Sequence, residues 1–335
     1  MKDYILQIKD LHTTFHSGTD GKESHAVNGI NINVERGKIL AIVGESGSGK
    51  SVTMMSVMRL HGSNVSYKGE VLLNGVDLLK LPENEMRKIR GGKISMIFQD
   101  PMTALNPVYT IGDQIKEMIK LHRPDITDPD AYAIELLNIV GISDGKRRLK
   151  QYPHELSGGR RQRVMIAMAL ASDPEILIAD EPTTALDVTV QAQIIDLIKE
   201  ITQKRNMTTI MITHDLGIVA GLCDNVVVLY GGKVCEQGTV KEIFKDSKHE
   251  YTKGLIEAVP SNVAGKKLVP IEGAPINPDS APAGCAFCAR CKNAMQICLT
   301  DYPPEEVFSP THTARCWMNE LPENNDSEKE DKAND

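Results

Sequence analysis

One eight-residue segment limits the fold of this chain more than any other part of the sequence. Residues 44–51 read Gly-Glu-Ser-Gly-Ser-Gly-Lys-Ser, the G-x-x-x-x-G-K-S pattern of a phosphate-binding loop. The glycines let the backbone curl so that successive N–H groups point at phosphate oxygens, and the helix that follows adds its positive N-terminal end. The pattern needs a buried strand before it, and the apolar run Ile39–Val43 meets that need. A chance glycine-rich turn is the alternative, and the flanking strand and helix patterns argue against it.

The side chains of this loop predict how it would bind ATP. Lys50 is expected to hold the β- and γ-phosphates, and Ser51 is expected to ligate Mg²⁺. The predicted phosphate site comprises Gly44, Ser46, Gly47, Ser48, Gly49, Lys50, Ser51 and Val52.

A second motif, Ile176–Glu181, is an apolar strand that ends in two acidic residues. Asp180 is predicted to lie beside Mg²⁺, and Glu181 to polarise the water that attacks the γ-phosphate, as a general base does. The alternative is an ordinary strand followed by a turn at Pro182. The phosphate-binding loop upstream favours the catalytic interpretation, so the sequence predicts an ATPase.

Short apolar runs separated by helical patterns predict an α/β fold with a parallel sheet and helices on its faces. Two turns, Asn74-Gly75 and Gly231-Gly232, indicate antiparallel strands at the edges. Residues 107–170 lack a strong strand pattern and are predicted to form a mostly helical insert. The predicted core strands are Ile39–Val43, Ile94–Phe98, Ile176–Ala179, Thr209–Thr213 and Val226–Tyr230.

The segment Leu156–Arg163 reads Leu-Ser-Gly-Gly-Arg-Arg-Gln-Arg and resembles the signature motif of ABC transporter ATPases. The resemblance implies a P-loop ABC ATPase fold: a RecA-like parallel sheet with an antiparallel β edge and a helical insert. It implies a nucleotide-binding domain over residues 1–255, with a helical subdomain over about 101–170. Two such subunits would stack head to tail, each presenting its signature to ATP on the other. Ser157 would also cap the following helix. The implied signature contacts are Ser157, Gly158, Gly159 and Gln162.

Three catalytic positions match this family in order along the chain. Gln99 corresponds to the glutamine that touches the metal and the attacking water, so the resemblance implies Mg²⁺ ligation by Ser51 and Gln99. His214 corresponds to the histidine that contacts the γ-phosphate. Together with Glu181 these residues form the implied catalytic set.

Two further positions match the family at the edges of the nucleotide site. Asp187 corresponds to the D-loop, which links the two ATP sites of a dimer. Phe15 corresponds to the aromatic residue that stacks on adenine, and His12 and His16 are the alternatives for that role.

Longer segments resemble the ATP-binding proteins of oligopeptide and dipeptide importers, and the match covers roughly residues 4–318. The segments that carry it are residues 99–107, 184–195, 214–220 and 251–260. The resemblance implies an ATPase that powers peptide import. Its partners would be a second ABC ATPase in a heterodimer, two transmembrane permease subunits and an extracytoplasmic substrate-binding protein. Nickel importers share these segments, so nickel is the alternative cargo. A soluble ABC ATPase that acts on DNA or ribosomes is the alternative from another class.

The composition changes near residue 255, because nine of the 17 prolines follow it. Residues 256–319 are predicted to form a loop-rich extension that contains five of the seven cysteines. Four thiolates can hold an iron–sulfur cluster or a structural zinc ion. The resemblance implies a [4Fe–4S] cluster, and Zn²⁺ and unliganded thiols are the alternatives. The implied ligands are Cys285, Cys291, Cys298 and Cys316, with Cys288 as a possible substitute.

The net charge of −7 is concentrated at the C-terminus. Residues 320–335 carry a net charge of −5 and are predicted to be a disordered acidic tail, which leaves only −2 for the other residues. A nearly neutral body argues against nucleic acid as a partner. The sequence has no apolar run of 18 residues and no signal-peptide layout at its start. We therefore expect a peripheral protein on the cytoplasmic face of the membrane, held there by its partners.

Overall fold

The computed structural model describes residues 2–17, 22–184, 186–259, 270–277 and 281–320. Its main sheet has eight strands in the order β11-β12-β10-β9-β3-β8-β7-β6. These strands are β3 (Ile39–Val43), β6 (Ile94–Ile97), β7 (Ile176–Asp180), β8 (Thr208–Thr213), β9 (Asn225–Tyr230), β10 (Lys233–Thr239), β11 (Glu306–Val307) and β12 (Thr313–Ala314). The five predicted core strands are all present, and their ends differ from the prediction by at most one residue.

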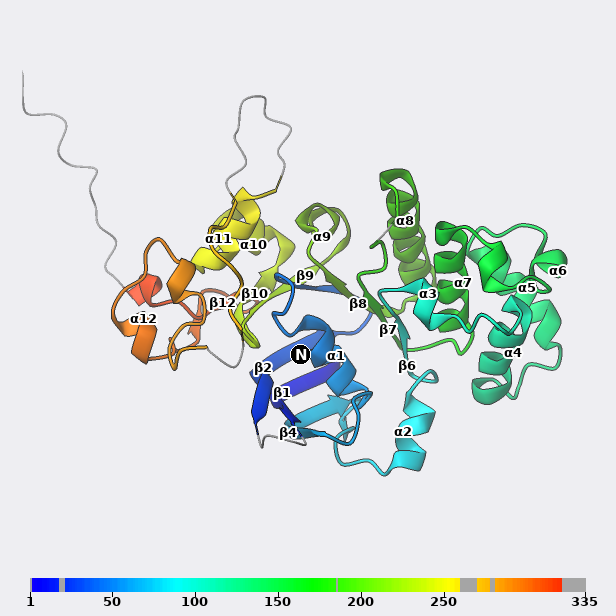
Figure 1. Ribbon diagram of the computed structural model, residues 1–335, viewed down its shortest axis with the longest axis horizontal. Helices are drawn as coiled ribbons and strands as arrows, with labels where there is room; N and C mark the ends of the chain where they lie inside the picture. The colour runs from blue at the N-terminus through cyan, green and yellow to red at the C-terminus, as the bar shows by residue number, and fades with distance from the viewer. Residues whose placement is uncertain (1, 18–21, 185, 260–269, 278–280, 321–335) are drawn as a thin grey trace, which may run out of the picture.

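The five central strands run parallel, and β10, β12 and β11 continue the sheet in antiparallel pairing. Every residue of β3, β7 and β8 is buried, which explains their continuous apolar pattern. Ile178, Ile210 and Ile212 pack toward α1 (Lys50–Val57) on one face. The other face packs against α7 (Gly158–Leu170), α8 (Val188–Arg205) and α9 (Leu216–Leu222) (Figure 1).

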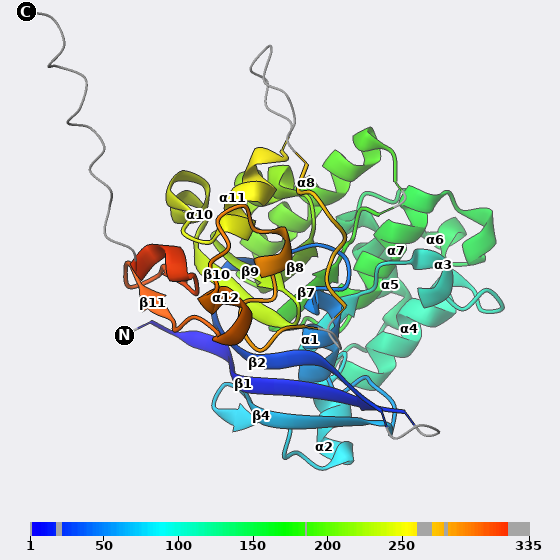
Figure 2. The same cartoon turned by 60° about the vertical axis from the view of Figure 1, so that its left-hand side comes forward.

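A second, four-stranded antiparallel sheet covers α1 from below in the order β2-β1-β4-β5 (Figure 2). Its strands are β1 (Tyr4–His16), β2 (Glu23–Glu35), β4 (Val65–Leu73) and β5 (Val76–Asp77). The predicted turn at Asn74-Gly75 joins β4 to β5, and both residues have the positive φ angle that this hairpin needs. Helix α2 (Glu83–Ile89) then leads to β6.

The predicted helical insert is present between β6 and β7. Its helices bury Ile115, Leu136 and Ile166 in one cluster that continues under the main sheet. The elements are α3 (Pro101–Ala104), α4 (Ile111–His122), α5 (Pro129–Ile139), α6 (Gly145–Arg148), the 3-10 helix η1 (Pro153–Glu155) and α7. In the described parts of the chain, no helix has the length and apolar character that a membrane crossing requires.

The C-terminal region packs on the edge of the main sheet opposite to the helical insert (Figure 1). Its elements are α10 (Val240–Asp246), α11 (Glu250–Glu257), η3 (Cys288–Arg290), α12 (Ile297–Thr300), β11, β12 and η4 (Trp317–Glu320). Strand β12 pairs with β10 through Glu236 and Gln237, so the extension contributes strands to the ATPase sheet itself. Of the predicted acidic tail, residues 321–335 lie outside the described residues.

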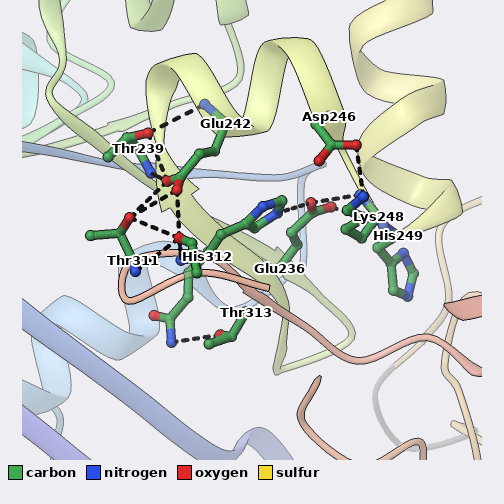
Figure 3. A network of polar contacts seen from close by, with 11 residues as sticks. Glu236, Thr239, Glu242, Asp246, Lys248, His249, Thr311, His312 and Thr313 are labelled. Carbon is green, nitrogen blue, oxygen red and sulfur yellow. Dashed lines mark hydrogen bonds and ion pairs between the residues drawn. The ribbon is translucent and has the colours of Figure 1, made fainter. Parts of the chain in front are cut away.

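A polar network holds this region against the sheet (Figure 3). Glu236 on β10 is fully buried. One of its carboxylate oxygens accepts hydrogen bonds from the Lys248 backbone N–H and from His312 Nε2, both at 2.7 Å. The other oxygen accepts from the His249 backbone N–H at 3.0 Å. A buried carboxylate with three donors is satisfied, and the network therefore joins the loop before α11 to the segment before β12.

Glu242 makes a second junction, between the start of α10 and the segment before β12 (Figure 3). Its carboxylate accepts hydrogen bonds from Thr239, which caps the helix, and from the hydroxyls of Ser309 and Thr311. Burial alone would raise the pKa of Glu242, but these hydrogen bonds outweigh burial and lower the pKa to about 2.

We expect Glu242→Gln to lower the free energy of unfolding by roughly 1 kcal/mol at pH 7, because the variant loses charge-assisted hydrogen bonds. The ionised carboxylate stabilises the fold fully above its ordinary pKa of 4.5, and this contribution is lost as the pH falls through about 2. Urea unfolding of both proteins between neutral and acidic pH should therefore show a difference that shrinks with falling pH. Glu257→Gln, at an exposed glutamate of α11, is the control. A pH-independent difference would contradict this explanation.

Candidate active site

The phosphate-binding loop lies between β3 and α1, as its sequence predicts. Gly44 has a φ of +152°, and a Cβ atom there would lie 2.2 Å from the Leu229 carbonyl oxygen. Gly49 precedes α1 with a φ of +96°, and a Cβ atom there would lie 2.8 Å from the Ala26 carbonyl oxygen. Only glycine fits these two positions, because β9 and β2 approach the backbone so closely.

Lys50 is buried at the first position of α1. Its ammonium group donates hydrogen bonds to the carbonyl oxygens of Gly44, at 2.7 Å, and Glu45, at 2.9 Å. Burial lowers the pKa of Lys50, and the nearby carboxylates of Glu181 and Asp180 oppose that shift. A buried cation beside curled backbone N–H groups suits a highly charged anion such as a triphosphate.

The two acids of the second motif lie at the carboxyl end of β7. Asp180 is buried, and its Oδ1 accepts a hydrogen bond from Ser51 Oγ at 2.9 Å. Burial raises the pKa of Asp180, the bond from Ser51 lowers it, and the neighbouring Glu181 raises it further. Oxygen donors of this kind are the ligands that Mg²⁺ prefers, so the pair fits the predicted metal position.

Glu181 is the centre of a hydrogen-bond network in which all three predicted catalytic residues meet. Its Oε2 accepts from Gln99 Nε2 at 3.0 Å and from Thr184 Oγ1 at 2.9 Å. His214 Nδ1 lies 3.3 Å from Oε1. Glu181 has a φ of +43°, an uncommon conformation for a residue that is not glycine. Gln99, Glu181 and His214 follow three different strands, so only the parallel sheet brings them together.

Thr184 is a member of this network that the sequence analysis did not identify. Its hydroxyl reaches Glu181 because the residues between them form a turn, in which the Thr184 N–H also bonds to the Glu181 carbonyl at 3.1 Å. A hydroxyl residue three positions after the predicted base was the available signal.

The signature residues lie at the start of α7, apart from the phosphate-binding loop. Ser157, Gly158 and Gly159 line an open hollow of about 480 Å³ together with Asp187, and no residue of the phosphate-binding loop lines it. Gln162 is not among its lining residues, because it lies in α7 with only 1% of its surface exposed.

Ser157 precedes α7, but the predicted capping hydrogen bond from its side chain is absent. This prediction was wrong because the N-terminus of α7 is exposed, so its N–H groups do not depend on the hydroxyl. Asp187 does cap a helix: its Oδ1 accepts from the Val190 N–H of α8 at 3.0 Å.

Phe15 lies near the end of β1, half-buried, with its ring against His61 at a centroid distance of 5.2 Å. The two alternatives for the adenine-stacking role are engaged in other contacts. His12 Nε2 lies 3.0 Å from Asp10 Oδ1, and His16 Nε2 lies 2.8 Å from Ser66 Oγ.

The cysteines of the extension are all free thiols. Cys285 Sγ lies 3.8 Å from His249 Nε2, and burial raises the pKa of Cys285 to about 12. Among the residues that the structure describes, no three His, Cys, Asp or Glu side chains are grouped as metal ligands. The four predicted cysteine ligands therefore do not form such a group here; Cys298 is buried, and the other three are partly exposed.

The chain has two positions suited to phosphate on one parallel sheet: the loop before α1, and the glycine-rich start of α7, which lines a separate hollow. The site and the fold together indicate an ATP-binding cassette. Comparison with known proteins agrees: residues 27–184 match the ABC transporter family, and residues 235–298 match the oligopeptide/dipeptide transporter C-terminal region. The chain belongs to the ABC transporter ATP-binding proteins, in the group that carries this C-terminal region.

Individual relatives cover nearly the whole chain. It is 49% identical over 319 residues to the dipeptide transport ATP-binding protein DppD of Bacillus subtilis, covering 94% of each protein. It is 47% identical to the oligopeptide transport ATP-binding protein OppD of Escherichia coli, covering 94% of this chain and 93% of that one. Among solved structures it resembles the ATP-binding cassette MJ0796, a dimer bound to ADP and phosphate, with a TM-score of 0.63, 28% identity and coverage of 70% of this chain and 98% of that chain.

We expect Gly44→Ala to abolish ATP binding and to lower the free energy of unfolding by about 2–4 kcal/mol, because the new Cβ would overlap the backbone of β9. Gly221→Ala is the matched control: nothing lies within 4 Å of a Cβ at Gly221, which is a helical position in α9. That control should keep its stability or gain up to about 1 kcal/mol. Calorimetric unfolding and ATP titration check both variants. Normal ATP binding by Gly44→Ala would contradict the assigned loop geometry.

Proposed function

We propose that this chain is an ATP-hydrolysing subunit that powers import of oligopeptides or dipeptides through a membrane transporter. The observation that carries the proposal is the joint presence of the Glu181 network and a C-terminal region shared with dipeptide and oligopeptide transport proteins. The Glu181 network supports ATP hydrolysis, and the C-terminal region supports peptides as the cargo.

The proposed hydrolysis assigns a distinct role to each group at the site. Lys50 and the loop N–H groups bind the β- and γ-phosphates of ATP. Ser51, Asp180 and Gln99 supply oxygen atoms for Mg²⁺, which neutralises phosphate charge when it is bound. Glu181 accepts a hydrogen bond from the attacking water and polarises it, while His214 contacts the γ-phosphate. The contacts of Gln99 and His214 with Glu181 support this arrangement, since they keep the three groups together.

The proposed partner at the signature hollow is a second, similar ABC ATPase in a heterodimer. Ser157 and Gly158 lie at an exposed helix start, where free N–H groups and the helix dipole favour a phosphate. The hollow is lined by Asp187 as well, which supports its use at a dimer interface. ATP would draw the two subunits together, and hydrolysis would release them, as a ligand-driven shift between open and closed dimers. Gln162 would need to move to take part.

The proposed permease contact is an apolar groove of about 210 Å³ between β6 and the helical insert. Phe98 lies in it with 42% of its surface exposed, directly before Gln99. Exposed apolar side chains beside the catalytic network suit a segment of a membrane subunit. This contact would hold the chain on the cytoplasmic face of the membrane. Methionine side chains are flexible, so they let the groove surface adapt to a partner. The methionines that line it are Met58, Met96, Met118, Met165 and Met168.

We also propose that the chain divides into residues 1–255, residues 256–319 and an acidic tail. A substrate-binding protein outside the membrane would deliver the peptide.

We further propose that the cysteines bind a [4Fe–4S] cluster or Zn²⁺. The C-x₅-C-x₆-C-x₁₇-C spacing supports a metal, whereas the described positions of the thiols do not form its ligand set. No step of the proposed hydrolysis depends on this group.

We expect Glu181→Gln to abolish peptide uptake and to lower ATP turnover at least about 100-fold, with ATP binding retained, because only the group that polarises water is lost. Cells that lack this chain would receive the wild type or the variant on a plasmid, and labelled di- to hexapeptides and labelled nickel would be offered. Asp196→Asn, on α8, is the control substitution. Uptake of nickel alone in the wild-type strain would refute the peptide assignment and leave the ATPase assignment intact.

We expect Phe98→Asp to weaken association with the membrane subunits about tenfold or more, because a charge replaces an apolar contact. ATP binding by the purified subunit should be unchanged. Leu121→Asp is the matched control, since Leu121 on α4 is 67% exposed and does not line the groove. Co-purification with tagged membrane subunits measures the effect. Equal losses from both variants would argue against the groove as the docking site.

We expect the chain purified without oxygen to contain either about four iron atoms or about one zinc ion per molecule. Elemental analysis and the visible spectrum distinguish the two. Cys298→Ser should lose the metal, and Cys223→Ser, whose cysteine lies in the ATPase body, should keep it. A folded wild-type chain without iron or zinc would show that the thiols are simply packing groups.

A further inference from the structure

Glu45, the residue that follows the first glycine of the phosphate-binding loop, is bound both within the loop and by groups from outside it. Its backbone N–H donates a hydrogen bond to the Tyr251 hydroxyl of α11 at 2.8 Å. Its carbonyl oxygen accepts from Lys50 Nζ at 2.9 Å and from the Ser48 N–H at 3.2 Å. The position of the whole loop therefore depends on where Glu45 is held.

The side chain of Glu45 forms a bidentate ion pair with Arg290 of the C-terminal extension. Arg290 Nη1 donates to Oε2 at 2.5 Å, and Nη2 donates to Oε1 at 3.0 Å. The two residues are 245 positions apart in the sequence. Only 6% of the Arg290 side chain and 25% of the Glu45 side chain are exposed, so water screens the pair weakly. Paired hydrogen bonds of this geometry fix direction as well as distance.

Arg290 is itself held rigidly by the extension. Its Nε donates to the Glu272 carbonyl at 2.9 Å, and Nη2 also reaches the Ile271 carbonyl at 3.3 Å. Nη1 lies 3.2 Å from the Tyr230 hydroxyl. The guanidinium carbon lies 5.9 Å from the ring centres of both Tyr230 and Phe287. A guanidinium with this many fixed partners can impose its position on Glu45.

We propose that Arg290 is a positioning residue for ATP: through Glu45 it holds the phosphate-binding loop in the shape that receives the phosphates. Lys50 holds the same stretch of backbone, but its ammonium group is also needed by the phosphates. The contacts from Arg290 and Tyr251 do not use Lys50, so they can persist while ATP is bound. The extension would thereby contribute to nucleotide affinity without touching the nucleotide.

Two simpler roles for the ion pair give different expectations. If it only docks the extension, removing it would lower stability and leave nucleotide affinity unchanged. If Glu45 and Arg290 act only as charges near the phosphates, removing the negative Glu45 would tighten nucleotide binding and removing the positive Arg290 would weaken it. A positioning role predicts that both substitutions weaken binding.

The test measures binding of MgADP to the full-length chain by titration calorimetry. The variants are Glu45→Gln, Arg290→Gln, Arg290→Lys and the double variant Glu45→Gln/Arg290→Gln. We expect Arg290→Gln to raise Kd about tenfold and the double variant to match it, because residues in one contact do not act additively. Arg290→Lys should recover part of the loss, since lysine keeps the charge without the fork. In the assembled transporter, KM for ATP should rise with little change in kcat.

Arg315→Gln is the matched control, because Arg315 forms an ion pair inside the extension with Glu305 at 3.2 Å. It should leave Kd unchanged. Unchanged Kd in Arg290→Gln, or tighter binding in Glu45→Gln, would overturn the proposal. If Arg290→Gln does not fold, Glu45→Gln alone tests the proposal. In that variant Arg290 keeps its carbonyl and hydroxyl acceptors, so the extension stays in place.

Discussion

The active site of this protein depends on one constraint, which is that parallel buried strands all end at the same edge of their sheet. The phosphate-binding loop, Gln99, Asp180 with Glu181, and His214 each follow the carboxyl end of a different parallel strand. The strands pair in register because their side chains are buried on both faces. Residues as far apart as Ser51 and Asp180, which are 129 positions apart, are thereby brought within hydrogen-bond reach. The contacts of Gln99 and His214 with Glu181 arise in the same way.

The C-terminal region extends this core instead of standing beside it. Strands β11 and β12 continue the main sheet, and the buried carboxylate of Glu236 joins β10 to the segments that flank it. The Arg290 contact then reaches across to the phosphate-binding loop. Buried charges that are fully paired are costly to separate, so these contacts bind the extension and the ATPase core as one unit. Through Arg290 and Glu45, the extension would then also contribute to nucleotide affinity.

Predictions from sequence succeeded where a local pattern has only one physical solution. Continuous apolar runs identified all five parallel strands of the main sheet, and Asn74-Gly75 identified a hairpin. They failed where solvent decides, because Ser157 makes no capping bond at an exposed helix start. The four-cysteine metal site stays a prediction, since the described residues contain no group of three or more metal-ligating side chains. Thr184 was missed because a hydroxyl three positions after a catalytic acid predicts a contact only once the turn between the two residues is known.

The sequence by itself determined the phosphate-binding loop, the strand that leads into it and the ATP-binding cassette class, because Gly44, Lys50 and the signature segment act through local backbone geometry and chemistry. Tertiary structure alone decided which distant residues meet. Tyr251 and Arg290 contact Glu45 only because the C-terminal region packs back onto the sheet. Such contacts depend on the relative placement of whole elements, which results from the packing of the entire core and leaves no periodic signal in either segment.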